Sequence, residues 1–276
     1  MTMIRKKLPS LLLELFLWLL ALTVIVPFLI MVFGSLKTNV EATSFDLSLP
    51  SSWEWSNYSR VVVEGKMIRS FLNGMLITGL AVLLNILVSS MAAFQIARRR
   101  TRTSEALYYF FFIGMLAPMQ MIPTIRLVQG FELYGTYLSV ILIYCVINMA
   151  FSIFLYVGFI RTTVPKALDE AAILDGASVG RLFFSVVFPL LRPVNMTILI
   201  IVFMNIWNDV NIPIFFLNDP KKWTMPLSVY QFFGMYSGSN WNLVFANLAL
   251  TALPVLIIYL LCQRYIVSGL TAGAVK

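Results

Sequence analysis

Residues 71–97 read FLNGMLITGLAVLLNILVSSMAAFQIA and contain no charged side chain, and residues 98–102 directly after them read RRRTR. A helix that crosses the hydrocarbon core of a bilayer needs about 20 consecutive apolar residues. This stretch is long enough to cross, and a basic flank is typical of a helix end at the cytoplasmic face. The stretch therefore predicts a membrane-spanning helix.

The composition of the whole chain agrees with this prediction. Of its 276 residues 60% are hydrophobic and only 12% are charged, whereas soluble domains carry about 25% charged residues. We expect an all-α integral membrane protein with six transmembrane helices. The other five spans are predicted at Leu11–Phe33, 106–125, 138–160, 183–208 and Leu243–Cys262. The first of them lacks a small-residue cleavage site and is expected to be retained.

The distribution of Lys and Arg predicts the orientation of these spans. Thirteen of the 20 basic residues fall on the side of the N-terminus, the 98–105 loop, the 161–192 segment and the C-terminal tail, and seven on the other side. Basic residues near helix ends are retained in the cytoplasm, so both termini are expected there. Residues 1–69 should form a cytoplasmic segment, the first span and an extracytoplasmic loop. Residues 70–263 should form a five-helix core with a cytoplasmic loop at 162–182, and residues 264–276 a cytoplasmic tail.

Several function classes are disfavoured by residues that the sequence lacks. The net charge of +8 lies beside apolar spans, which points to anionic lipid rather than to nucleic acid. The chain has no histidine, the commonest general base and metal ligand. Cys145 and Cys262 lie far apart in apolar stretches and predict no metal site. No phosphate-binding G-x-x-x-x-G-K-[ST] motif occurs. We expect no catalytic residue, metal or cofactor on this chain.

The stretch between the predicted fourth and fifth spans reads VPKALDEAAILDGASVGR from Val164. Pro165 favours a helix start, with Thr162 or Thr163 as its cap. Gly176 permits a left-handed helix end, and a second helical piece is expected from Ser178 towards Pro189. These signals predict a short helical hairpin on the cytoplasmic surface.

This hairpin resembles the EAA loop of the permease subunits of binding-protein-dependent ABC importers. Glu170-Ala171-Ala172, then Gly176, then Pro189 keep the spacing of that loop, with Val186 and Phe188 where Ile and Leu are usual. Four further stretches resemble carbohydrate-type permeases, and the second permease of maltose-type importers most of all. They are Trp53 to Tyr58, Trp207-Asn208-Asp209, Asn218 to Pro226, and Gln263 to Lys276.

The resemblance implies a type I importer permease fold, a sugar or oligosaccharide as cargo, and a bacterial cytoplasmic (inner) membrane. It implies a heterodimer with a second permease, two cytoplasmic ATPase subunits that bind ATP-Mg, and an extracytoplasmic sugar-binding protein. Its loop docks as a coupling helix into a groove of the ATPase, so the expected coupling residues are Asp169, Glu170, Ala171, Ala172, Asp175, Gly176 and Pro189.

A translocation path needs polar groups and aromatic faces along a cavity. Polar groups in or near the spans, which tend to face the bundle interior, are Asn85, Asn148, Asn205, Asn208 and Asp209. The candidate path residues are Asn148, Asn205, Trp207 and Asn208. The alternative is that the asparagines join helices and the tryptophan anchors the chain at the interface, and we favour this alternative. In maltose-type importers the sugar contacts lie in the other permease.

The sequence disfavours two other functions. A secondary transporter or channel for a small polar solute usually carries ionisable residues in mid-membrane, and the predicted spans hold almost none. A membrane enzyme is disfavoured because clustered carboxylates, histidine and an activated cysteine are lacking.

Overall fold

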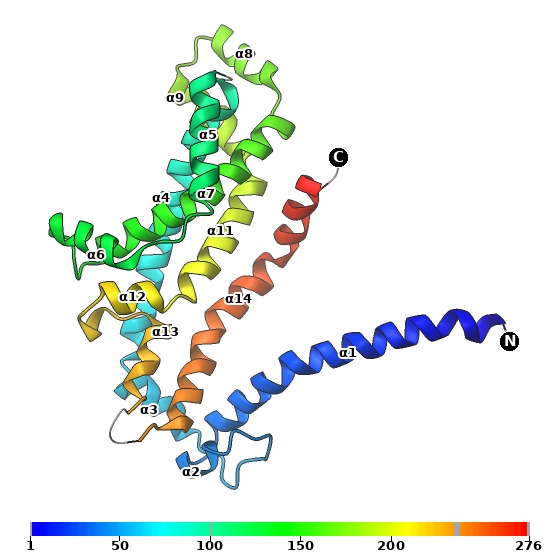
Figure 1. Ribbon diagram of the computed structural model, residues 1–276, viewed down its shortest axis with the longest axis vertical. Helices are drawn as coiled ribbons and strands as arrows, with labels where there is room; N and C mark the ends of the chain where they lie inside the picture. Colours follow the sequence, from blue (N-terminus) through cyan, green and yellow to red (C-terminus); the bar gives the residue numbers. More distant parts are fainter. Residues whose placement is uncertain (1, 100, 235–237, 275–276) are drawn as a thin grey trace. The chain divides into compact units, whose positions relative to one another are not determined.

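The computed structural model describes the backbone of residues 2–99, 101–234 and 238–274, and the side chains of 13–99, 101–234 and 238–261. Every regular element in these ranges is a helix (Figure 1). Four helices are long and apolar enough to cross a membrane, and they contain the predicted first, second, fourth and last spans. These helices are α1 (Thr2–Ser35), α4 (Met67–Arg98), α7 (Tyr137–Thr163) and α14 (Trp241–Ala274).

The predicted third span, 106–125, is wrong as a single helix. The structure divides it into α5 (Arg102–Gly114) and α6 (Met121–Gly130). Pro118 lies in the break, where it has no N–H to donate and disfavours a helical residue before it. The 13 residues of α5 rise only about 20 Å, less than the roughly 30 Å of a hydrocarbon core.

The predicted fifth span, 183–208, is bent rather than straight. Its first piece comprises α9 (Val179–Arg181), the π-helix η1 (Leu182–Val187) and α10 (Phe188–Leu190), and its second piece is α11 (Arg192–Trp207). The two pieces meet at 75°. Pro189 and Pro193 flank the bend, and each lacks the N–H that would continue the helical ladder. The described residues thus hold four spans, or five if the bent pair is one, and six spans are not confirmed.

The remaining helices are short and lie in the connections. They are α2 (Asn39–Ala42), α3 (Ser56–Glu64), α8 (Lys166–Leu174), α12 (Asn211–Phe216), η2 (Pro220–Lys222), α13 (Met225–Ser228) and η3 (Val229–Gln231). The chain divides into two compact units, residues 1–68 with 228–253 and residues 69–227 with 254–276.

The first unit is organised around buried polar side chains after α1. Asn57, 3% exposed, donates its Nδ2 to the carbonyls of Ser35 and Lys37, both at 3.0 Å, and its Oδ1 accepts a bond from Asn242. The buried Lys37 ammonium lies 2.7 Å from Oδ1 of Asp46. These bonds hold the turn that follows α1 against the start of α14.

The second unit contains the helices that form the candidate sites. Asn85 of α4, fully buried, donates to the carbonyl of Cys145 at 3.0 Å and accepts the hydroxyl of Ser152 at 2.6 Å. Asn85 therefore joins α4 to α7, as expected of a polar group in a membrane helix bundle.

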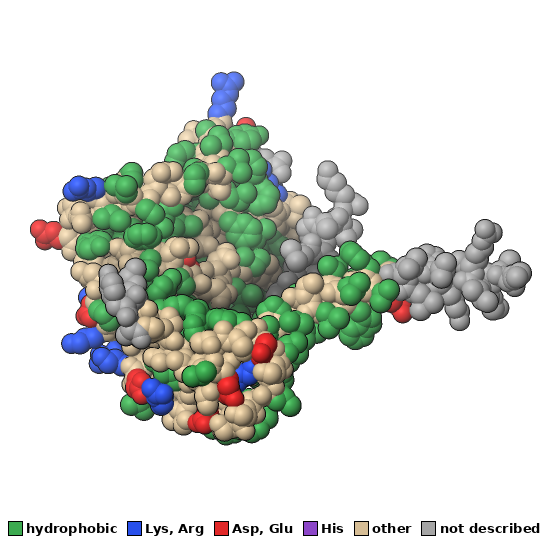
Figure 2. Space-filling model, turned by 60° about the horizontal axis from the view of Figure 1, so that its bottom comes forward, with side chains coloured by type: hydrophobic (Ala, Val, Ile, Leu, Met, Phe, Trp, Pro, Cys, Tyr) green, Lys and Arg blue, Asp and Glu red, His purple; other side chains and the backbone are tan. Residues whose placement is uncertain are grey.

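Apolar side chains cover much of the visible surface of the described residues (Figure 2). None of the most apolar stretch of α1 is buried, and large apolar side chains on α4, α7 and α14 are exposed as well. A surface of this kind is stable in lipid, where exposing apolar groups has no hydrophobic cost.

Candidate functional site: a surface hairpin and a polar cavity

The predicted hairpin is present and its first helix, α8, ends in a Schellman motif. Gly176 adopts φ +78°, its N–H donates to the carbonyl of Ile173 at 3.0 Å, and the N–H of Ala177 donates to that of Ala172 at 2.9 Å. This pair of bonds satisfies carbonyls that a helix end otherwise leaves unpaired. The left-handed residue at Gly176 therefore sets the direction in which the chain leaves α8.

The predicted threonine cap of α8 is wrong. Pro165 occupies the cap position and makes no side-chain cap, while the Thr162 hydroxyl donates back to the carbonyl of Gly158. The second helical piece begins where predicted, because Ser178 accepts a bond from the N–H of Arg181 at 3.4 Å.

An ion pair holds the first turn of α8 to the end of α4. Nε of Arg98 lies 2.6 Å from Oδ2 of Asp169, and Nη2 donates to Oδ1 at 3.1 Å. The third nitrogen, Nη1, donates to the carbonyl of Val164 at 3.1 Å. Arg98 and Asp169 side chains are only 11% and 13% exposed. One guanidinium thus contacts the ends of α4 and α7 and the start of α8.

Most of the surface of α8 is uncovered in this chain. No residue of α8 is buried, and Leu168, Ile173 and Leu174 are 39%, 61% and 88% exposed. Glu170, Ala171 and Asp175 are exposed as well, and Ala172 is half-buried. Pro189 is exposed and lies in α10, directly after the π-helix, so it is at the bend and not on α8.

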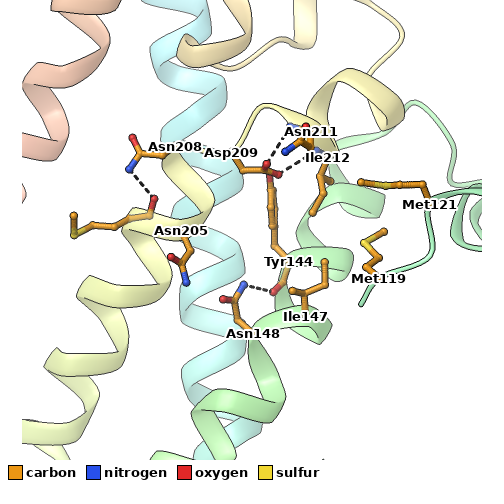
Figure 3. Close-up of a pocket in the computed structure, with 11 residues that line it drawn as sticks. Met119, Met121, Tyr144, Ile147, Asn148, Asn205, Asn208, Asp209, Asn211 and Ile212 are labelled. Carbon is orange, nitrogen blue, oxygen red and sulfur yellow. Dashed lines mark hydrogen bonds between the residues drawn. The ribbon is translucent and has the colours of Figure 1, made fainter. Parts of the chain in front are cut away.

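A second feature is an open cavity of about 690 Å³ in the second unit (Figure 3). It lies among α7, α11, α12 and the connection between α5 and α6. Its lining residues are Met119, Met121, Tyr144, Ile147, Asn148, Met204, Asn205, Asn208, Asp209, Asn211 and Ile212. This lining combines amides and a carboxylate with thioethers and aliphatic groups, and it contains no Lys or Arg.

Three of the four predicted path residues line this cavity. Asn148 donates its Nδ2 to the carbonyl of Tyr144 at 2.9 Å, and Asn208 donates to that of Met204 at 3.0 Å. Both bonds lie within the residue's own helix, so neither amide joins two helices through them. Asn205 is exposed on the same face of α11 (Figure 3).

Trp207, the fourth predicted path residue, does not line the cavity. It is 2% exposed, stacks on Phe203 with ring centroids 5.5 Å apart, and meets Phe71 edge to face at 5.9 Å. Gly74 of α4 gives the indole room, because a Cβ there would lie 3.3 Å from it. Trp207 therefore packs α11 against α4.

Asp209 forms the centre of the polar side of the cavity. Its Oδ2 accepts the Tyr144 hydroxyl at 2.8 Å and the N–H of Ile212 at 3.1 Å, and its Oδ1 accepts the N–H of Asn211 at 3.0 Å. The three donors hold the carboxylate at the start of α12, between α11 and α7 (Figure 3).

Asp209 is among the polar groups that the sequence places in or near the spans, and it lines the cavity. Sequence reasoning missed the roles of Arg98 and Tyr144. The arginine block indicates only an orientation when it is considered alone, although Asp169 in the predicted hairpin is an acid that could pair with it. Nothing local points to Tyr144. Among the described residues no group of three or more Cys, Asp or Glu could hold a metal.

Apolar helices long enough to span, a short uncovered surface helix and a polar cavity define a multi-span membrane transport protein. The chain belongs to the family described as binding-protein-dependent transport system inner membrane component, which matches residues 85–271. It is thus a non-catalytic inner-membrane subunit of an ABC importer, which works with an ATPase and a substrate-binding protein.

Curated relatives match over nearly the whole length. The melibiose/raffinose/stachyose import permease protein MelC of Bacillus subtilis (strain 168) is 38% identical over 91% of both chains. The probable starch degradation products transport system permease protein AmyC of Thermoanaerobacterium thermosulfurigenes is 35% identical over 93% of both. The diacetylchitobiose uptake system permease protein NgcG of Streptomyces coelicolor is 30% identical over 95% of this chain and 87% of its own.

A solved structure shows the same fold. A chain of a bacterial ABC transporter involved in the import of the acidic polysaccharide alginate superposes with a TM-score of 0.81. The match covers 95% of this chain and 97% of that chain at 21% identity. The type I permease fold predicted from the sequence is therefore confirmed.

Proposed function

We propose that this subunit pairs with a second, different permease to translocate a sugar or oligosaccharide into the cell by alternating access. In this proposal both termini and α8 are cytoplasmic, and two ATPase subunits that bind ATP-Mg drive the cycle. The relatives named for melibiose, starch degradation products and diacetylchitobiose support a glycoside as cargo.

The observation that carries the coupling role is the exposed apolar surface of α8. The helix is attached to its own chain through Asp169, while Leu168, Ile173 and Leu174 are exposed. An apolar patch on an element outside the spans is the expected signature of a protein interface. The ATPase would cover this patch, with Glu170, Ala171, Ala172 and Asp175 on the same helix and Gly176 ending it. Pro189 would shape the bend that leads into α11.

The cavity supports a role in translocation. Amide groups of Asn148, Asn205 and Asn208 are suited to exchange hydrogen bonds with sugar hydroxyls, because an amide both donates and accepts. The apolar part of the lining is suited to the C–H faces of a sugar ring. The Asp209 carboxylate adds an acceptor and a negative charge, which favours uncharged cargo over acidic sugars.

The coupling role is tested by Leu174→Asp in the complete importer, purified through a tag on this chain. We expect the ATPase subunit to be lost from the purified complex, because the charge would be buried in the interface. Val63→Asp is the matched control, since Val63 of α3 is also exposed and apolar. An ATPase that stays bound to the Leu174→Asp subunit would refute the role of α8.

The path is tested by Asn148→Leu and Asn205→Leu, with uptake of a radiolabelled neutral oligosaccharide as the measurement. We expect a higher KM for uptake in both, and no change for Gln95→Leu, an exposed amide of α4 outside the cavity. Unchanged uptake in both asparagine variants would show that the cavity is not part of the translocation path. Uptake that survives ATP depletion but stops with an uncoupler would instead indicate a secondary transporter.

A further inference from the structure

Few side-chain contacts connect α8 to the membrane helices. Residues of α8 contribute no buried side chain, so packing inside this chain holds the helix only weakly. The ion pair between Asp169 and Arg98 is a side-chain bond from α8 to another helix of the bundle. A force applied to α8 can therefore pass through this pair, through Val164 and Pro165 to α7, or through the chain that continues into α9 and η1.

The ion pair fixes the distance between α8 and the end of α4. Nη2 of the guanidinium donates to Oδ1 of the carboxylate at 3.1 Å, and Nε lies 2.6 Å from Oδ2 without making a hydrogen bond. A hydrogen bond between two charged groups is stronger than one between neutral groups. The bond from Nη1 to Val164 adds a third point at the end of α7. Low exposure of both side chains protects the pair from competition by water.

Arg98 is the last residue of α4. The same uninterrupted helix also contacts α7 and α11, which carry residues that line the cavity. Asn85 bonds it to α7, and Phe71 and Gly74 contact Trp207 of α11. One helix thus connects Arg98 to the two helices that carry Tyr144, Asn148 and Asn205.

We propose that the Arg98–Asp169 pair is the positioning joint through which movement of α8 is transferred to α4 and so to the cavity. This inference rests on the proposed coupling role of α8. Arg98 touches neither nucleotide nor cargo, and it acts by fixing α8 relative to the ends of α4 and α7.

The test uses the complete importer in proteoliposomes and measures cargo transported per ATP hydrolysed. Asp169→Asn keeps the size of the side chain but removes its charge, and Arg98→Lys keeps the charge but removes the guanidinium that bonds both Asp169 and Val164. For both variants we expect ATP hydrolysis to persist while this ratio falls. The expected fall is about tenfold, within the range of coupling between distant sites. The exchange Arg98→Asp with Asp169→Arg should restore most of the ratio, and Arg99→Ala, an exposed neighbouring arginine, should leave it unchanged.

A double variant, Arg98→Met with Asp169→Leu, separates coupling from stability. It removes both charges and leaves neither buried alone, so the protein should insert and bind the ATPase normally. The amount of cargo transported per ATP hydrolysed should still fall in this double variant. A wild-type ratio in this variant and in Asp169→Asn would overturn the inference, whereas loss of ATPase binding in Leu174→Asp would show that the coupling role of α8 still holds. An ATPase that stays bound to Leu174→Asp would refute that role itself.

Discussion

The hydroxyl of Tyr144 on α7 donates a 2.8 Å hydrogen bond to Oδ2 of Asp209, which also accepts the first N–H groups of α12. A bond to a charged acceptor inside a helix bundle contributes about 1.5–3 kcal/mol. Tyr144→Phe should therefore lower the free energy of unfolding in detergent by about that amount. Phe159→Leu, a smaller change elsewhere on α7, serves as a comparison. An unchanged free energy would show that the backbone amides alone hold the carboxylate.

The charge of Asp209 should also select cargo. Asp209→Asn keeps the side-chain shape and one acceptor oxygen but removes the negative charge from the cavity. We expect this variant to transport an acidic oligosaccharide, such as a uronate-containing one, better relative to a neutral oligosaccharide than the unaltered importer does. The ratio of the two uptake rates is the measurement. An identical ratio of uptake rates in both proteins would show that the charge of Asp209 does not affect the choice of cargo.

Substitutions at Gly176 should affect transport through the backbone conformation that they allow, and not through the volume of the new side chain. Its φ is +78°, and no atom lies within 4 Å of a Cβ built there. Gly176→Ala should cost about 1–2 kcal/mol at this turn because L-residues avoid the left-handed region. Asn tolerates that region best among the other residues. Transport should therefore fall in the order Gly, Asn, Ala, Val at this position, and equal rates for Asn and Val would contradict the strain argument.

Asn85 should stabilise the contact between α4 and α7. Asn85→Leu leaves the Ser152 hydroxyl and the Cys145 carbonyl without this partner, and it should lower the free energy of unfolding by about 1–2 kcal/mol. Adding Ser152→Ala should recover part of the loss, because one of the unpaired groups is removed. Thermal unfolding of the single and double variants in the same detergent measures this, and additive losses would argue against the shared bond.

The loop after α1 should lose stability in acid. The ammonium of Lys37 and the hydroxyl of Ser48 hold the pKa of Asp46 well below its usual range. Because the pKa is lower in the folded state, the pair stabilises the fold fully above the unfolded pKa of about 3.9 and progressively less as the pH falls further. Asp46→Asn should remove this acid dependence and leave Lys37 buried without its carboxylate. Proteolysis of residues 38–55 as a function of pH would detect both effects.

Much of the fold could be predicted because crossing a membrane depends on a property of consecutive residues. A run such as 71–97 needs only length and lack of charge to be assigned, and α4 covers all of it. The prediction of a single helix for the third span was wrong because of one residue. Pro118 broke an otherwise apolar stretch, and hydropathy averaged over a window does not register a missing N–H. The bend at Leu191 has the same origin in Pro189 and Pro193.

The sequence by itself determined four spanning helices, the hairpin and the left-handed turn at Gly176, since each depends on residues close together in the chain. Only the tertiary structure decided that Arg98 meets Asp169, that Tyr144 meets Asp209, and that Trp207 packs inside while Asn148, Asn205 and Asn208 face the cavity. Those relationships depend on the rotation of each helix about its axis. That rotation is set by packing between segments far apart in the sequence, which no local pattern encodes.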